Sequence, residues 1–348
     1  MKAGLDQGCV NMFRAVLPKS MILIATSLVF LVSLAVFISA HVWVPSQVRS
    51  VQALYPSLKD KNVDQILVFL EKENGVLSLE LEQLLNIIRS NPGNNQLINE
   101  MVDIREKLVQ VNETISRLIL IVHHPFIAFV NHFESTYLMI TPISFFFLIF
   151  SLLFTVWYGQ LYSSGILHII VSGIGRKRIM LKLVKEAALI AILVTIPIVA
   201  SMVIGLATNP VMGAAIVLSL DTVGSILIYF LSTALSLVIL VFFGVSLVTL
   251  SSGSVIEALT FILVYDLVLP VLIPFLNGFY TYFLIAGLRP LDVATFSVYL
   301  LFAPPQYKSE ISMFLGCDPV LLMIVVFFLV ASLSVVLLVV SFLRKDFV

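Results

Sequence analysis

The sequence predicts an all-α membrane protein with six transmembrane helices. Its residues are 60% hydrophobic and only 11% charged, whereas about a quarter of the residues in an ordinary soluble domain are charged. Apolar runs of about 20 residues are long enough to cross a bilayer as helices. Six such runs occur along the chain: 21–43, 137–158, 187–207, 223–249, 255–276 and 319–343.

The first run is expected to be a transmembrane helix and not a cleaved signal peptide. Its apolar stretch extends from Met21 to about Ala40, which is longer than the core of a typical signal peptide. No clear small-x-small cleavage site follows it. We therefore take 21–43 as the first membrane span.

A polar insert, 44–135, separates the first two spans. Before the break at Asn91-Pro92-Gly93-Asn94, apolar residues recur at steps of four and three. After the break a second stripe keeps the same alternation. This spacing predicts a helical hairpin or short coiled coil outside the membrane, acting as a spacer or dimer contact, or alternatively as a partner-binding or substrate-handling element. The two stripes are Leu77, Leu81, Leu84 and Ile88, then Leu97, Met101, Ile104, Leu108, Val111, Ile115 and Leu118.

Basic residues beside the spans predict that both termini are cytosolic. Lys2, Arg14 and Lys19 precede the first span, five basic residues lie within 176–185, and Arg344 and Lys345 follow the last span. Lys and Arg favour the cytosolic side of a membrane, and six spans place all three groups on that side. We expect a multi-pass protein of the cell membrane. The chain has 20 basic and 20 acidic residues. We take the basic residues as membrane-orienting and not as a stripe that binds nucleic acid.

Several kinds of chemistry have no motif in this chain. It contains no Gly-x-x-x-x-Gly-Lys-Ser/Thr loop for ATP, no Gly-x-Ser-x-Gly and no His-Glu-x-x-His. His123, His124 and His132, with Glu134, match no standard metal-site spacing. We expect no enzymatic activity, cofactor or metal in this chain. Cys9 and Cys317 fall on opposite sides of the predicted membrane and are not expected to form a disulfide.

One acidic residue, Asp266, falls well inside the fifth span. A carboxylate at membrane depth is costly and often functional. We favour a carboxylate that is paired with a neighbouring helix or protonated; an ion-coupled transport role is the alternative.

The segment from Asn277 to Asp318 contains apolar stretches of about eight to ten residues, which are too short to cross a bilayer. It is expected to form re-entrant or interfacial helices before the last span, with two extra spans as the alternative.

The segment from Tyr158 to Lys182 resembles the connection between the second and third spans of ABC transporter type-2 permeases. In that family a glycine is followed by apolar residues, a turn, and then Arg or Lys leading into the next span. Gly165, Arg176, Arg178 and Lys182 fall on those positions, and Lys177 lies within the basic run. Ser163 and Ser164 stand where the family often has an acidic residue. The resemblance implies that 159–186 is a cytosolic coupling loop contacting an ATPase.

The resemblance extends over nearly the whole chain. It implies a cytosolic N-terminal interfacial helix within 1–20, an extracytoplasmic insert at 44–135 and a five-span transmembrane domain at 136–348. The implied partners are a separate cytosolic ATP-binding cassette ATPase, a second permease subunit (the same or a different chain) and membrane lipids.

The expected function is that of the permease subunit of an ABC exporter whose cargo is a lipid, glycoconjugate, peptide or drug-like molecule. One alternative is an ATPase-linked mechanotransmitter or membrane scaffold that moves no cargo. A second is an ion-coupled carrier using Asp266, or a membrane enzyme that needs no ATPase.

Overall fold

The computed structural model describes residues 19–59, 61–90, 94–135, 142–209, 211, 220–264 and 318–344. Every regular element in these ranges is a helix, so the prediction of an all-α chain is confirmed for them. The predicted interfacial helix at 3–18, the re-entrant segment 277–317 and Asp266 lie outside the described residues.

The described residues form eleven helical elements. Their bounds are α2 (Lys19–Leu54), η1 (Pro56–Leu58), α3 (Val63–Ser90), α4 (Asn95–His123), α5 (Pro125–Ser135), α6 (Pro142–Ser163), α7 (Ile166–Ile174), α8 (Arg176–Ala207), α10 (Leu220–Leu250), α11 (Val255–Leu263) and α15 (Pro319–Arg344).

Three of the described helices are long and apolar enough to cross a membrane: Leu23–Leu54, Arg176–Ala207 and Thr222–Leu250. Shorter apolar stretches occur within two further helices, Leu148–Ser163 in α6 and Phe327–Leu343 in α15. The described chain is therefore that of a membrane-embedded helical protein. Two boundaries differ clearly from expectation. The helix of the first span, predicted to end at 43, continues to Leu54. The helix predicted to begin at 187 begins at Arg176, so the basic residues occupy its first turns.

The chain divides into two units. Unit 1 comprises 1–36, 130–201 and 224–348, and unit 2 comprises 37–129 and 202–223.

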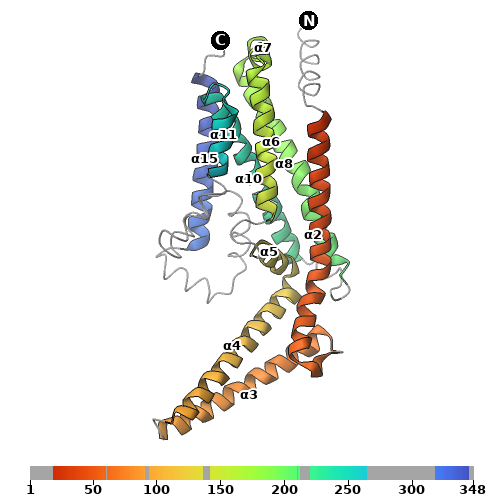
Figure 1. Cartoon of the computed structure of the whole chain (residues 1–348), viewed down its shortest axis with the longest axis vertical. Helices are drawn as coiled ribbons and strands as arrows, with labels where there is room; N and C mark the ends of the chain where they lie inside the picture. The colour runs from red at the N-terminus through yellow and green to blue at the C-terminus, as the bar shows by residue number, and fades with distance from the viewer. Residues whose placement is uncertain are drawn as a thin grey trace. The chain divides into compact units, whose positions relative to one another are not determined.

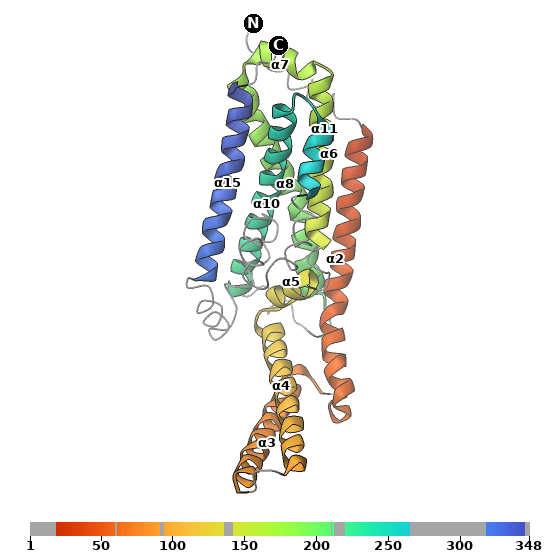
Figure 2. The same cartoon turned by 60° about the vertical axis from the view of Figure 1, so that its left-hand side comes forward.

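The core of unit 1 joins six helices. In Figures 1 and 2, α6, α8, α10 and α15 run side by side. Their inward side chains form one buried cluster with α7 and α11, and α6 also contacts α7 and α11 directly. The cluster contains Phe154, Trp157, Tyr158, Leu161, Tyr162, Leu167, Val171, Ile179, Leu183, Ala187, Val241, Phe242, Val245, Val248, Ala258, Leu338 and Phe342.

The core of unit 2 is formed by α3, α4 and the end of α2. Helices α3 and α4 lie side by side in both views and contact one another (Figures 1 and 2). The buried residues of the cluster are Val48, Val51, Leu58, Ile66, Leu70, Leu77, Val111, Ile115 and Leu118. Asn94 caps α4, its side chain accepting a hydrogen bond from the Gln96 amide. The apolar stripes noted in the sequence thus face inward along this pair.

Within unit 2, Asn209, two residues after the end of α8, forms a hydrogen bond with α2. The Asn209 side chain donates to the carbonyl of His41 at 2.7 Å and accepts from the Val211 amide at 2.8 Å. Asn209 is buried, so both contacts satisfy groups that have lost water.

Candidate coupling site

The predicted connection at 159–186 is not an extended loop. It consists of the end of α6, a turn at Gly165, the nine-residue helix α7, a second turn at Gly175 and the first turns of α8. A short helix therefore lies between two glycine turns within this segment, and its role as a cytosolic coupling loop stays a prediction.

Both glycines have positive φ angles. Gly165 precedes α7 with φ of 73°, and Gly175 follows it with φ of 90°. L-residues with a Cβ rarely adopt such angles, whereas glycine does so at little cost. A Cβ at either position would meet nothing within 4 Å. Backbone conformation, and not crowding, therefore explains why glycine suits both ends of α7.

Helix α7 has one buried and one exposed face. Leu167 and Val171, four residues apart, belong to the unit 1 core, as the spacing of an amphipathic helix requires. Ile169 is 67% exposed and Ser172 is exposed as well. The helix is thus anchored by two core residues and presents a surface containing an isoleucine.

The basic residues lie on the first turns of α8 and have different environments. Arg176 is half-buried, and its Nη1 donates to the carbonyl oxygen of Leu343 in α15 at 3.2 Å. Lys177 and Arg178 are exposed, and Lys182 is half-buried. The structure therefore assigns Arg176 a role in joining α8 to α15. Within the consecutive run 176–178, Lys177 and Arg178 are the cations presented at the surface; Lys185, further along α8, is exposed as well.

A buried hydrogen bond fixes α6 against α10 near this site. The Tyr158 hydroxyl lies 3.0 Å from Oγ1 of Thr249, and both residues are fully buried. The single Thr249 hydroxyl proton is directed to the carbonyl of Val245 at 2.8 Å. Tyr158 must then be the donor, because a threonine has only one O–H to give.

The turn between α10 and α11 packs on the end of α6. A Cβ placed on Gly253 would lie 2.7 Å from Cδ1 of Tyr162. At a second contact between the same segments, a Cβ on Gly159 of α6 would collide with the side chain of Val255, the first residue of α11. Ser254 caps α11 by accepting from the Glu257 amide at 3.4 Å. The contact of this turn with α6 joins residues about ninety positions apart in the sequence, and no local pattern predicts it.

Sequence reasoning also missed α7 as a separate helix. The signal was present, because the apolar residues between Gly165 and Gly175 follow helical spacing and glycine marks both ends.

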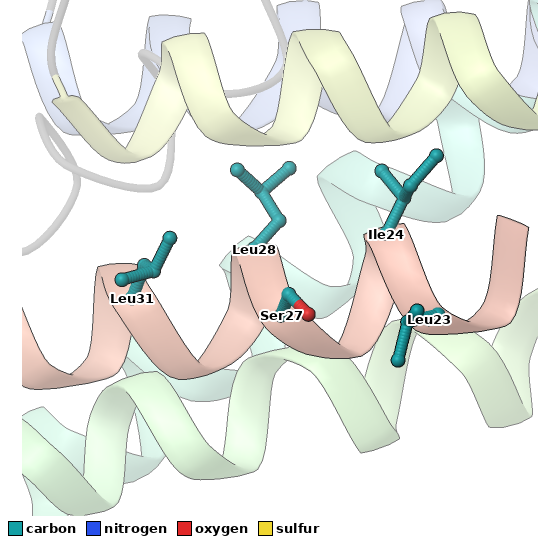
Figure 3. A pocket seen from close by; sticks show the side chains of 5 residues that line it. All are labelled: Leu23, Ile24, Ser27, Leu28 and Leu31. Atoms are coloured by element: carbon teal, nitrogen blue, oxygen red, sulfur yellow. The ribbon is translucent and has the colours of Figure 1, made fainter. Parts of the chain in front are cut away.

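The N-terminal part of α2 has an open apolar face. A groove of about 320 Å³ is lined by Leu23, Ile24, Ser27, Leu28 and Leu31, all from this one helix. Figure 3 shows Ile24 and Leu28 along one edge of this face of α2 and Leu23 along the other edge. Such a surface is suited to lipid or to another apolar helix.

The described residues contain no group of three or more His, Cys, Asp or Glu side chains arranged to hold a metal ion. No protein-family model, curated protein or solved structure matches the chain. The assignment of a function therefore depends on its residues and their geometry.

Proposed function

We propose that this chain is the permease subunit of an ATP-binding cassette transporter, and that α7 with Lys177 and Arg178 receives a cytosolic ATPase subunit. The observation that carries the proposal is the short helix α7, held between two glycine turns and followed at once by two exposed cations. An exposed apolar residue with adjacent cations is a surface suited to a folded protein partner.

The packing of unit 1 supports a mechanical role for this surface. Leu167 and Val171 of α7 belong to the same buried cluster as residues of α6, α8, α10, α11 and α15. Close-packed cores transmit displacement because they contain few voids. Movement of α7 by an ATPase would therefore reach the apolar helices and bias them between two arrangements, the logic of alternating access.

The proposed topology has six spans with both termini cytosolic. Charge bias supports it, because Lys177 and Arg178 join the N-terminal and C-terminal basic residues on one side. The exposed apolar face of α2 would meet lipid or a second permease subunit.

Purification in mild detergent from the native cells tests the proposal. An ATP-binding subunit is expected to accompany the wild-type protein. It should be lost from the variant Lys177→Ala/Arg178→Ala, with the permease still folded. Lys177→Arg/Arg178→Lys keeps the charges that orient the membrane and should retain the ATPase. Lys185→Ala removes another exposed cation of α8 as a control.

Arg176 is left unchanged in these variants because its contact with Leu343 would confuse loss of folding with loss of coupling. Absence of an ATP-binding subunit from every preparation would refute the proposal. Retention by Lys177→Ala/Arg178→Ala would refute the assigned site alone.

A second function, an ATPase-linked mechanotransmitter, is favoured by one observation. Helix α2 extends from Lys19 to Leu54 with Pro45 inside it, and Val48 and Val51 near its end belong to the buried cluster of α3 and α4. Displacement of α2 would therefore reach the hairpin through a packed joint. Reconstituted vesicles separate the two functions. ATP-dependent accumulation of a labelled lipid supports export. An ATP-dependent change in the signal of a spectroscopic label on the α3–α4 hairpin, without movement of cargo, supports force transmission.

A further inference from the structure

One side of α8 changes from basic to apolar along its length. At about 100° per residue, this side is the arc that lies within about 60° of Arg178 in either direction. In chain order the arc contains Arg178, Leu181, Lys182, Lys185, Leu189, Ile192, Leu193, Ile196, Val199, Ala200, Val203 and Ala207. Its three cations therefore all precede Leu189, and every later residue of the arc is apolar.

This basic-to-apolar face is open over most of its length. From Arg178 to Ile196 every residue of the arc is exposed except Lys182, which is half-buried. Leu189 is 51% exposed and Ile196 is 49% exposed. The α8 residues that belong to the unit 1 core lie on the other side of the helix: Ile179, Leu183 and Ala187.

The uncharged length of α8 matches the thickness of a bilayer. From Ala187 to Ala207 the helix has 21 residues and no charge. At 1.5 Å per residue they extend over about 31 Å, and the hydrocarbon core of a bilayer is about 30 Å thick. Lys185 and Lys182 then lie about 3 Å and about 8 Å outside the hydrocarbon, within the headgroup layer. Arg178 lies about 14 Å outside it, beyond that layer.

The charge at this end of α8 is predominantly positive. Glu186 is the one acidic residue of the helix, against five basic residues. It lies about 80° from Arg178, at the margin of the face and outside the arc. A lysine can extend its aliphatic stem over apolar surface while its ammonium group stays among polar groups. The two lysines of the headgroup layer are thus suited to an anion that is attached to an apolar chain.

We propose that Lys182 and Lys185 bind the phosphate headgroup of an acidic phospholipid whose acyl chain lies along Leu189, Ile192 and Ile196. Basic side chains near a membrane surface attract lipids that carry a net negative charge. The inference requires only that α8 crosses a membrane. It depends neither on an ATPase partner nor on which end of α8 is cytosolic.

A second copy of the chain is a poorer occupant of this face. Two copies inserted in the same direction and paired through it would bring the cations of one α8 against those of the other. Like charges facing one another disfavour such pairing. An acidic lipid instead meets both parts of the face, the cations with its headgroup and the apolar residues with its chain.

Native mass spectrometry of the full chain in a non-ionic detergent tests the proposal. The probes are phosphatidylglycerol and phosphatidylcholine with identical acyl chains, added in equal amounts. The wild-type protein should bind phosphatidylglycerol at least about fivefold more tightly. Glycerophosphoglycerol, the same headgroup without acyl chains, should not displace the bound lipid at an equal concentration, because it lacks the apolar contact.

Variants locate the binding. Lys182→Gln/Lys185→Gln should reduce the preference to about twofold or less, whereas Lys182→Arg/Lys185→Arg should retain it. The matched control Lys177→Gln/Arg178→Gln removes the same charge from the same helix, outside the headgroup layer, and should also retain it. Lys185→Gln alone changes one exposed side chain and should lower the preference at least about twofold. Thermal unfolding checks that each variant is folded.

Four outcomes would overturn the proposal. The two lipids bind equally, Lys182→Gln/Lys185→Gln keeps the full preference, the Lys177→Gln/Arg178→Gln control loses as much of it, or the soluble headgroup displaces the lipid. Disulfide-linked dimers of Leu189→Cys in native membranes, with Cys9 and Cys317 first replaced by serine, would show instead that a second copy covers the face.

Discussion

The hydroxyl of Tyr158 in α6 donates a hydrogen bond to Oγ1 of Thr249 in α10 across 3.0 Å, within a fully buried part of unit 1. The Thr249 proton is itself committed to the carbonyl of Val245. The pair is therefore asymmetric: one residue gives and the other receives. It joins α6 five residues before its end at Ser163 to α10 one residue before its end at Leu250.

This asymmetry predicts unequal effects of removing the two partners. Tyr158→Phe deletes the donor and leaves Thr249 bonded to Val245, at a cost of about 0.5–1.5 kcal/mol. Thr249→Val leaves a buried tyrosine hydroxyl without its acceptor, at a cost of about 1–3 kcal/mol. Thermal unfolding in one detergent should therefore rank Thr249→Val as the less stable variant. The double variant should be no less stable than Thr249→Val alone, and equal single effects would contradict the assigned donor.

The turn at Gly175 predicts opposite effects of alanine at two glycines. Its φ of 90° and ψ of 143° lie in a region reserved almost entirely for glycine, so Gly175→Ala should cost about 1–3 kcal/mol. Gly75 lies inside α3 with open space around it, and Gly75→Ala should stabilise the hairpin by about 0.5–1 kcal/mol. Thermal unfolding of both variants measures the signs. A neutral Gly175→Ala would show that the turn is not held as described.

The region around α7 illustrates which features of the fold can be predicted from the sequence and which cannot. Composition and apolar run lengths were sufficient for the all-α membrane class, because bilayer thickness sets helix length. The four-three spacing identified the residues that become the inner faces of α3 and α4. The break of α7 from α8 was missed, although Gly165 and Gly175 marked it. The contact of Arg176 with Leu343 joins residues far apart in sequence, and no local pattern predicts it.

The close approach of α6 and α11 predicts a paired effect at Gly159 and Val255. Gly159→Ala would place a methyl group against a β-branched side chain with little rotamer freedom, at a cost of about 1–3 kcal/mol. Val255→Ala should make room for it, so the double variant should be more stable than the sum of the single effects predicts. A strictly additive double-mutant cycle would argue against this contact.

The proposed orientation predicts which positions an impermeant thiol reagent reaches. Cys9 and Cys317 are first replaced by serine. Val68→Cys should then be labelled in intact cells, whereas Arg178→Cys and Ser252→Cys should be labelled only after permeabilisation. All three positions are solvent-accessible in the structure, so a difference reports the side of the membrane. Labelling of 68 and 178 from the same side would contradict the topology.

Photo-crosslinking from position 169 tests the central claim most directly. Ile169 is 67% exposed on α7, so a photoreactive side chain there should be tolerated. In native membranes we predict an adduct between this position and an ATP-binding subunit, identified by mass spectrometry. The same group at Val68 of α3, which is 66% exposed, should give no such adduct. Efficient crosslinking at 169 to other proteins or lipid, without any ATP-binding subunit, would contradict the coupling role of α7.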